Sequence, residues 1–276
     1  MNAPVVLVTG ASRGIGAATA LAFGRKGWRV AIAARTLAEG QTLNHQLRYR
    51  DGQHLAGSLA TTAAALRAIG AEVFAQAMDL TDPASLDAGL DAVLAHYGRI
   101  DLLVNNAVYQ DAETNALIAD LDEAALARTL QGNVVAPYRL ARRLLPTLVA
   151  QGGGKIINVC SGAGKHDPPV AADHGGWGYA YGASKAALAR LAGIINREYG
   201  ERGVRAYSVN PGVVATEALR ATIGTGGNIA KRYGAAAPET VAAALYWVAT
   251  DPRAPALAAD PQMIDLQPLA AEFHLI

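Results

Sequence analysis

Cysteine is nearly absent from the sequence: Cys160 is the single one, so no disulfide can form within the chain. That composition is typical of a reducing compartment. No stretch approaches the roughly 20 apolar residues that a membrane-spanning helix needs. The N-terminus lacks a basic region, and its apolar run is too short for a signal peptide. We therefore expect a cytoplasmic protein without a membrane as partner.

Neither sign of charge is in clear excess, with 24 basic and 23 acidic side chains and a formal net charge of +1. This balance gives no electrostatic reason to expect nucleic acid as partner. The 276 residues are enough to bury one substantial core. Because no linker, charge run or internal repeat divides the chain, we expect residues 1–276 to form a single domain.

Short apolar runs, each followed by an amphipathic stretch, recur along the whole chain. The runs predict strands at residues 5–9, 28–34, 72–77, 102–104, 155–160 and 204–209, with a weaker one at 263–266. Helical patterns lie between them, including residues 14–26, 84–96, 123–150, 181–199 and 238–250. Such alternation predicts parallel βαβ units, and uniformly apolar strands are typical of a sheet covered on both faces. The expected fold class is α/β, with a doubly wound parallel sheet.

Two of the expected connections are long for a compact domain, residues 36–58 and 162–178. Long connections without secondary structure are often functional. The alternative is an ordered surface excursion, which is the interpretation we favour for residues 36–58.

The first expected strand ends in Thr9-Gly10-Ala11-Ser12-Arg13-Gly14-Ile15-Gly16, at the start of a helix. Glycines at such a turn let the backbone approach a pyrophosphate, and helix N-terminal amides favour the anion. Taken alone, the turn leaves nucleotide binding and plain turn chemistry equally open. Its spacing resembles the Thr-Gly-x-x-x-Gly-x-Gly signature of short-chain dehydrogenases/reductases, whose Rossmann-type fold has three α/β/α layers. The resemblance implies cofactor contacts at Gly10, Ser12, Arg13, Gly14, Ile15 and Gly16.

The end of the second expected strand bears on which nicotinamide cofactor is used. An NAD enzyme typically carries Asp or Glu there, to accept hydrogen bonds from the ribose hydroxyls. Here Ala34 is followed by Arg35, and Arg13 lies in the glycine turn. Arginine forms charge-assisted, often bidentate bonds with phosphate. The pair therefore favours NADP(H) over NAD(H), the alternative being that both arginines are solvated surface charges.

Tyr181 and Lys185 lie four residues apart at the start of an expected helix. That spacing places both side chains on one helical face, one turn apart. A phenol is a weak base at neutral pH, and a neighbouring ammonium stabilises its phenolate form. Tyr181 could then accept a proton from an alcohol, or donate one to a carbonyl oxygen. In isolation, a Tyr-x-x-x-Lys pair is usually structural.

The order of the motifs adds to this interpretation, because Ser161 and then Tyr181 and Lys185 follow the glycine turn, as in the family's catalytic pattern. By that resemblance, Ser161 hydrogen-bonds the substrate oxygen, Lys185 also binds the nicotinamide ribose, and Asn133 holds a water in the proton relay. Asn133 could instead be a satisfied polar group within its helix. Residues 162–178 lengthen the usual distance between Ser161 and Tyr181, so we expect them to shape a substrate pocket or form a lid.

Nearby residues offer rival interpretations. Tyr179 is a second phenol, but it lacks a lysine four residues on. Cys160 is more simply a small buried hydrophobe than a nucleophile. The spacing of His166, Asp167 and His174 fits no zinc pattern, so we expect solvated loop side chains and no metal.

The resemblance extends nearly to the end of the chain. Asn105-Asn106-Ala107 resembles the family's Asn-Asn-Ala-Gly element, with Val108 at the position of the family's glycine. Glycine tolerates backbone angles that a β-branched residue such as valine resists. Residues 217–237 resemble the family's substrate loop. The remaining cofactor contacts that the family implies are Asp79, Leu80, Asn106, Ala107, Tyr181, Lys185, Pro211, Gly212, Val214 and Thr216.

These motifs lead to one principal hypothesis, an NADP(H)-dependent oxidoreductase that moves hydride between the cofactor and a ketone or secondary alcohol. Two alternatives stay open: a cofactor-binding sensor or scaffold without useful turnover, and a non-redox reaction such as epimerisation or dehydration. The expected partners are a small carbonyl or alcohol substrate and further copies of the chain, in a dimer or tetramer. The substrate's identity cannot be read from the spacing.

Overall fold

A single parallel sheet runs through the protein, in the computed structural model that describes residues 3–41, 43, 47–49, 51–223, 234–257 and 263–275. Its seven strands follow the order β3-β2-β1-β4-β5-β6-β7, and all neighbouring strands are parallel. They are β1 (Val5–Thr9), β2 (Arg29–Ala34), β3 (Val73–Ala77), β4 (Leu102–Asn105), β5 (Gly154–Val159), β6 (Val204–Asn210) and β7 (Ile264–Asp265). The doubly wound parallel sheet predicted from the sequence is confirmed.

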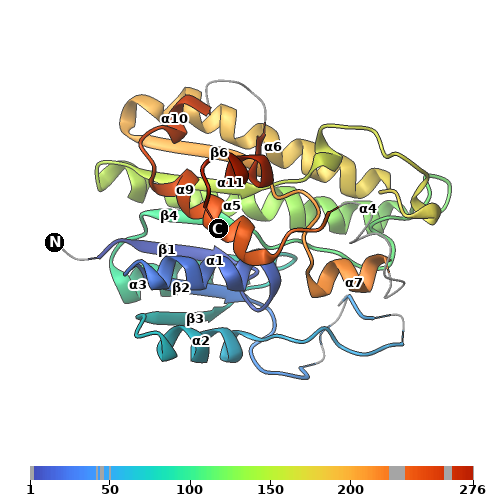
Figure 1. Ribbon diagram of the computed structural model, residues 1–276, viewed down its shortest axis with the longest axis horizontal. Coiled ribbons are helices and arrows are strands. Elements are labelled where there is room, and N and C mark those ends of the chain that lie inside the picture. The colour runs from blue at the N-terminus through green and yellow to red at the C-terminus, as the bar shows by residue number, and fades with distance from the viewer. Residues whose placement is uncertain are drawn as a thin grey trace.

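Helices cover both faces of this sheet (Figure 1). They are α1 (Gly14–Arg25), α2 (Leu59–Ala68), α3 (Pro83–Tyr97), α4 (Glu123–Leu130), α5 (Ala136–Ala150), α6 (Tyr179–Tyr199), α7 (Glu217–Ile223), α9 (Pro238–Thr250), α10 (Ala254–Leu257) and α11 (Leu266–Glu272). The winding changes direction between β1 and β4, and the carboxyl ends of strands beside such a switch point form the usual ligand crevice of open α/β sheets.

Each face of the sheet has its own apolar core, because side chains alternate along a strand. Val6 and Val8 of β1 face a core that contains Phe23 of α1 together with residues of α2, α9 and α11. Val5 and Leu7 face the opposite core, with side chains of α3, α5 and α6. All four of these β1 side chains are fully buried. Their burial on both faces fixes β1 at the centre of the sheet and so fixes the glycine turn that follows it.

Local sequence signals set several helix boundaries. Ser58 precedes α2, and its side chain accepts a hydrogen bond from the backbone N–H of Thr61. Asp82 caps α3 in the same way, with Pro83 at the first helical position and Gly98 in a left-handed conformation after the last. Such caps satisfy backbone groups that the helix itself leaves unpaired. Side-chain caps therefore mark the first turn of both helices.

The helix expected over residues 123–150 is not continuous. A five-residue π-helix, Gln131–Val135, separates α4 from α5, and such bulges often occur at functional sites. The helix expected to begin at residue 181 begins two residues earlier, at Tyr179. Most expected strands differ from the observed ones by a residue or two, and the weak one at 263–266 is reduced to Ile264–Asp265. Of the candidate catalytic residues, Asn133 therefore lies in the π-helix and not in a regular α-helix, whereas Tyr181 and Lys185 lie in the expected helix.

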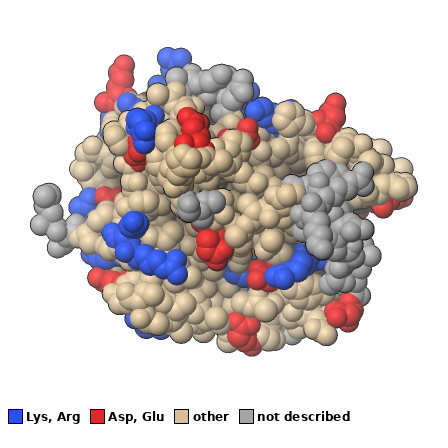
Figure 2. Space-filling view, viewed as in Figure 1, with Lys and Arg blue, Asp and Glu red and all other residues tan. Residues whose placement is uncertain are grey.

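The expected loops are partly described. In the connection 36–58, residues 42, 44–46 and 50 lie outside the described residues, as do residues 224–233 of the expected substrate loop. Residues 162–178 contain two short 3₁₀ turns, Gly162–Gly164 and Ala172–His174. None of the helices in the described ranges combines the length and the apolar character that crossing a membrane requires. Basic and acidic side chains lie interspersed on the face shown in Figure 2.

Candidate active site

The glycine turn after β1 packs against the residues that follow β4. Gly10 has a φ of +68°, and a Cβ built there would lie 2.7 Å from the Cα of Ala107. A Cβ on Gly16 would lie 2.2 Å from the carbonyl oxygen of Gly10. Heavy atoms cannot approach so closely, so both positions require glycine. Ser12, between them, is buried.

Thr9 ties these two segments together. Its Oγ1 accepts hydrogen bonds from the backbone N–H groups of Asn106 and Ala107, both at 3.1 Å. The side-chain amide of Asn106 donates to the carbonyl oxygen of Thr9 at 2.9 Å. Val108, where the family has glycine, is partly exposed, and among the described residues His274 is the only non-glycine residue with a positive φ. The valine therefore adopts a conformation that any residue can take.

The N-terminus of α1 is open to an anion. Arg13 is the N-cap residue, but no side chain caps the first-turn amides, and the first turn has no acidic residue. Gly14 has a φ of +54°, and a Cβ there would lie 3.1 Å from Cγ2 of Thr216. Ile15 packs against the core that includes Phe23. Uncapped amides and the helix dipole favour a bound phosphate, so these residues fit a dinucleotide.

Two arginines lie beside this turn. The Arg13 side chain donates to the carbonyl oxygens of Ala56 and Gly57, at 2.8 and 2.7 Å. Arg35, directly after β2, lies 3.9 Å from a carboxylate oxygen of Asp79, which follows β3. Burial lowers the pKa of Arg13, the nearby Arg35 adds to that shift, and acidic neighbours oppose it. The second strand ends without a carboxylate, as the sequence predicts.

The acidic neighbours of Arg13 include one residue that the sequence did not single out. Glu217, the first residue of α7, raises the pKa of Arg13 more than any other carboxylate does. A Cβ on Gly14 would lie 3.6 Å from its Oε2. That oxygen is buried and has no hydrogen-bond partner among the described residues. The Glu217 carboxylate thus lies beside the N-terminus of α1, where the uncapped amides favour an anion.

The residues after β3 are held by local hydrogen bonds. Oδ1 of Asp79 accepts from the backbone N–H and the hydroxyl of Thr81, at 2.8 and 2.7 Å. The backbone N–H of Asp79 donates to the Ser85 hydroxyl at 3.1 Å. Leu80 packs against the core that α3 and α5 share. Asp79 is therefore fixed at the carboxyl edge of the sheet, next to Arg35.

Lys185 joins α6 to the end of β5. Its side chain is buried, and its Nζ donates to the carbonyl oxygen of Val159 at 3.0 Å. The same Nζ lies 5.8 Å from the centre of the Tyr181 ring. The spacing of four residues thus places the ammonium beside the phenol, as the sequence predicts.

Ser161 follows β5 two residues after the carbonyl group that Lys185 contacts. Its Oγ accepts a hydrogen bond from the backbone N–H of Ala163 at 3.2 Å, which begins the turn Gly162–Gly164. A Cβ on Gly164 would lie 2.6 Å from the carbonyl carbon of Lys185. Because only glycine permits that contact, the turn carrying Ser161 packs directly on α6 beside the tyrosine and lysine.

Asn133 lies in the π-helix and is buried. Its Oδ1 accepts from the backbone N–H of Tyr109 at 2.7 Å, and its Nδ2 donates to the Tyr109 carbonyl oxygen at 3.2 Å. The same amide donates to the Ser184 hydroxyl at 3.3 Å. Asn133 is thus a satisfied polar group, but its partners lie on other elements: the segment after β4, and α6 between Tyr181 and Lys185.

The rival residues occupy other surroundings. Tyr179 is 56% exposed, whereas Tyr181 is partly buried. Cys160 is buried, and burial raises the pKa of its thiol to about 11. A thiol with that pKa is protonated at neutral pH and is a poor nucleophile. The prediction that Cys160 is a small buried hydrophobe agrees with these observations.

The turn after β6 is tied down by two side chains that the sequence did not single out. Oδ1 of Asn210 accepts from the backbone N–H groups of Gly162 and Gly212, at 3.0 and 3.1 Å. The amide of Gln267 donates to the carbonyl oxygens of Pro211 and Val213. Beyond the turn, Val214 is buried, and Thr216 lies against Gly14. These bonds hold the residues from Pro211 to Thr216 opposite the glycine turn.

The connection 162–178 is attached to the segment after β4. The backbone N–H of Gly178 donates to Oδ1 of Asn115 at 3.1 Å. A Cβ on Gly178 would lie 2.6 Å from the Ala116 carbonyl oxygen. His174 pairs with its neighbour Asp173, and within the described ranges no group of His, Cys, Asp and Glu side chains is placed to hold a metal ion. The two segments therefore form a shared wall beside the start of α6.

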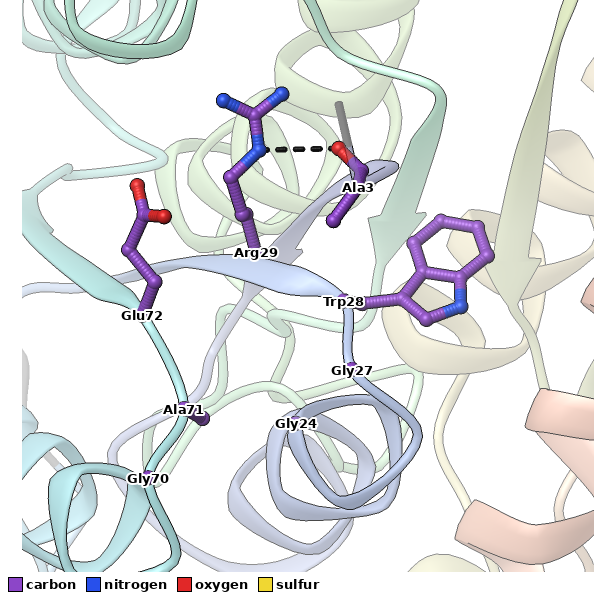
Figure 3. A pocket seen from close by; sticks show the side chains of 8 residues that line it. All are labelled: Ala3, Gly24, Gly27, Trp28, Arg29, Gly70, Ala71 and Glu72. Atoms are coloured by element: carbon purple, nitrogen blue, oxygen red, sulfur yellow. Dashed lines mark hydrogen bonds between the residues drawn. The ribbon is translucent and has the colours of Figure 1, made fainter. Parts of the chain in front are cut away.

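A separate hollow, shown in Figure 3, lies at the end of the sheet where the strands begin, away from the candidate active site. It has a volume of about 370 Å³ and is lined by Ala3, Gly24, Gly27, Trp28, Arg29, Gly70, Ala71 and Glu72. Arg29 and Val73 begin β2 and β3, so the hollow lies at the amino ends of these strands. Figure 3 shows the Arg29 side chain bonded to the Ala3 carbonyl oxygen. None of the candidate site residues lines this hollow.

The chain is similar to known proteins over most of its length. Residues 4–58 and 53–225 match the protein family described as short chain dehydrogenase. The D-threitol dehydrogenase of Mycolicibacterium smegmatis is 35% identical over 257 residues, covering 91% of this chain and 87% of that protein. The cyclohexanol dehydrogenase of a Rhodococcus species is 31% identical over 265 residues, covering 91% of each. A solved metagenomic short-chain oxidoreductase in complex with NADP has a TM-score of 0.68 and 30% identity, covering 95% of this chain and 94% of that one.

Proposed function

The chain belongs to the short-chain dehydrogenase/reductase family, and we propose that it transfers hydride between NADP(H) and a ketone or secondary alcohol, with Tyr181 as general acid and base. The observation that carries this proposal is the position of Lys185. Its buried ammonium lies beside the Tyr181 ring and is bonded to the end of β5, next to Ser161. A substrate oxygen that reaches this end of α6 would meet the Tyr181 hydroxyl on one side and the Ser161 hydroxyl on the other.

Each side chain has a role in this reaction. The nicotinamide, when bound, supplies the hydride for reduction or takes it up in oxidation. In reduction, Tyr181 would donate its hydroxyl proton to the carbonyl oxygen of the substrate, which becomes the hydroxyl group of the product alcohol. Ser161 donates a hydrogen bond to the same oxygen and stabilises its developing charge. Lys185 stabilises the tyrosinate that remains and binds the ribose, while Asn133 holds a water in the relay that returns the proton.

NADP(H) is the cofactor that the charges favour. The uncapped N-terminus of α1 suits the diphosphate. Arg35 directly follows Ala34, at the strand end where an NAD enzyme would carry a carboxylate, and Arg13 lies in the glycine turn. Arginine at these positions suits a 2′-phosphate. Asp79, Leu80, Asn106 and Ala107 would line the adenosine and ribose, with the residues from Pro211 to Thr216 on the nicotinamide side. The NADP complex of the metagenomic relative supports this assignment.

The substrate class rests on the relatives of the chain. The relatives described above are named for the oxidation of D-threitol and of cyclohexanol, both of which have secondary alcohol groups. In this chain, the wall formed by residues 109–118 and 162–178 would shape the pocket. A secondary alcohol or the corresponding ketone is therefore the substrate class we assign.

We also propose that the protein is one domain and assembles with further copies of itself. Val135 at the end of the π-helix and Tyr138 of α5 are 41% and 48% exposed, and Ile194 of α6 is 48% exposed. Burial of these side chains against a partner chain would remove their apolar surface from water. Light scattering after size-exclusion chromatography tests this proposal, and a mass of 28.5 kDa would contradict it.

A side-by-side fluorescence titration with NADPH and NADH tests the proposed function, followed by a screen of ketones with the tighter cofactor. We expect tighter binding of NADPH and oxidation of NADPH by at least one ketone. Equal binding of the two cofactors would contradict the NADP(H) assignment. Binding without turnover of any ketone or alcohol would support a sensor or scaffold. Product formation without net cofactor oxidation would support epimerisation or dehydration.

A further inference from the structure

The long connection after β2 reaches back to the glycine turn. Nε of Arg13 donates to the carbonyl oxygen of Ala56 at 2.8 Å, and its Nη2 donates to that of Gly57 at 2.7 Å. Both acceptors lie in the connection, more than 40 residues away in sequence. Arginine has five N–H donors in a planar fork. Two of its nitrogen atoms are thus bonded to the connection, which fixes the plane and direction of the guanidinium group.

Gly57 is required for this contact. Its φ is +107°, and a Cβ built there would lie 2.5 Å from the carbonyl oxygen of Ser12 and 2.8 Å from Cβ of Arg13. Any other residue would push the connection away from the glycine turn or distort it. The close approach is therefore specific to glycine at this position.

A carboxylate anchors the same stretch to α2. Oε2 of Glu39 accepts from the backbone N–H of Gly57 at 3.0 Å, and its Oε1 accepts from the Thr61 hydroxyl at 2.6 Å. These two bonds lower the pKa of Glu39, the bond from Thr61 contributing most. Thr62, the next residue of α2, donates to the carbonyl oxygen of Ala11 in the glycine turn at 2.9 Å. Helix α2 is thus bonded through Thr61 to the Glu39 carboxylate that binds Gly57, and through Thr62 to the glycine turn that carries Arg13.

We propose that Glu39, Ala56 and Gly57 are positioning residues of the coenzyme site, which favour NADP(H) over NAD(H) by holding the Arg13 guanidinium ready for the 2′-phosphate. This inference rests on the proposed cofactor. A long side chain loses rotamer freedom when it binds a ligand, and holding it in place beforehand avoids much of that loss. The connection 36–58, favoured above as a surface excursion, then has a function through Glu39, Ala56 and Gly57.

The test compares Gly57→Ala with the control Gly52→Ala. Gly52 lies in the same connection and has a φ of +81°, but a Cβ built there would meet no atom within 4 Å. Gly52→Ala therefore introduces the same kind of backbone strain as Gly57→Ala, without a clash against the glycine turn. Dissociation constants for NADPH and NADH are measured by fluorescence on the full chain. Gly57→Ala should raise the NADPH constant at least about tenfold while changing the NADH constant much less. Gly52→Ala should change neither.

A double-mutant cycle with Arg13→Ala shows whether Gly57 acts through Arg13. If it does, Gly57→Ala has no further effect on NADPH binding once Arg13 is alanine. Equal weakening of both cofactors by Gly57→Ala, additive effects in the cycle, or no change would each overturn the inference. A wild-type protein that binds NADPH and NADH equally would instead contradict the proposed cofactor, so the two failures are distinguishable.

Discussion

Asn133 binds both backbone groups of Tyr109, accepting from its N–H at 2.7 Å and donating to its carbonyl oxygen at 3.2 Å. The π-helix and the segment after β4 are thereby joined beside α6. Asn196 of α6 binds the backbone of Ala206 in the same way, with two bonds of 2.7 Å. The Asn133 amide lies among the candidate catalytic residues, whereas the Asn196 amide does not.

Replacing each asparagine with alanine separates stability from catalysis. Both variants leave a backbone N–H and carbonyl unpaired, so each should lose about 1–3 kcal/mol of unfolding free energy. Only Asn133→Ala should also lower kcat, by at least about tenfold, because it also disturbs the proton relay. Urea unfolding and steady-state kinetics check this prediction, and equal kcat values for the two variants would contradict a role of Asn133 in turnover.

Two helical glycines offer a second matched pair. A Cβ on Gly132 would lie 2.4 Å from Cβ of Tyr109, whereas a Cβ on Gly193 of α6 meets nothing within 4 Å. Gly132→Ala should therefore lose about 1–3 kcal/mol of unfolding free energy through overpacking. Gly193→Ala should gain about 0.5–1 kcal/mol through helix propensity. Similar stabilities of the two variants would show that the π-helix does not depend on its contact with Tyr109.

Glu217 should oppose cofactor binding. Its Oε2 is buried beside Gly14 without a hydrogen-bond partner in the described ranges, where the cofactor's anionic diphosphate is expected. Glu217→Gln should tighten NADPH binding roughly fivefold, which corresponds to removal of a repulsion of about 1 kcal/mol. Glu72→Gln, at the opposite edge of the sheet, serves as control and should leave the dissociation constant unchanged. Weaker binding by the Glu217 variant would indicate that the carboxylate helps to hold the site.

Cys160 should make stability depend on alkaline pH. Burial raises the pKa of its thiol from the ordinary value of 9.0 to about 11. A group whose pKa is raised by folding stabilises the folded state below its unfolded pKa, and this contribution is lost as pH rises. Between pH 9 and 11, the wild type should therefore lose more unfolding free energy than Cys160→Ala does. Parallel stability curves for the two proteins would contradict this prediction.

Much of the site could be predicted because its residues are local in sequence. Tyr181 and Lys185 are one helical turn apart, and the glycine turn follows a strand that its apolar residues identify. The parallel sheet could be predicted as well, because the alternation of strands and helices is also visible along the sequence. These features depend on periodicity and short spacing, which the sequence displays directly.

Other features depend on contacts between distant residues. The π-helix interrupts a continuous helical pattern where Gly132 meets Tyr109, a contact that the pattern of residues 123–150 does not contain. Asn210 and Gln267 bind backbone groups on other segments, and Gly57 meets Ser12 across the glycine turn. Polar residues and glycines of this kind look like ordinary turn residues until the fold brings their partners together.

Tyr181→Phe is the most direct test of the central claim, that Tyr181 carries the proton in hydride transfer. The change removes the hydroxyl and keeps the ring beside Lys185. The kcat value with the ketone found in the screen should fall by roughly 10²- to 10⁴-fold, while the NADPH dissociation constant changes little. Tyr179→Phe, at a more exposed phenol two residues away, should retain activity. Unchanged turnover of Tyr181→Phe would contradict the account.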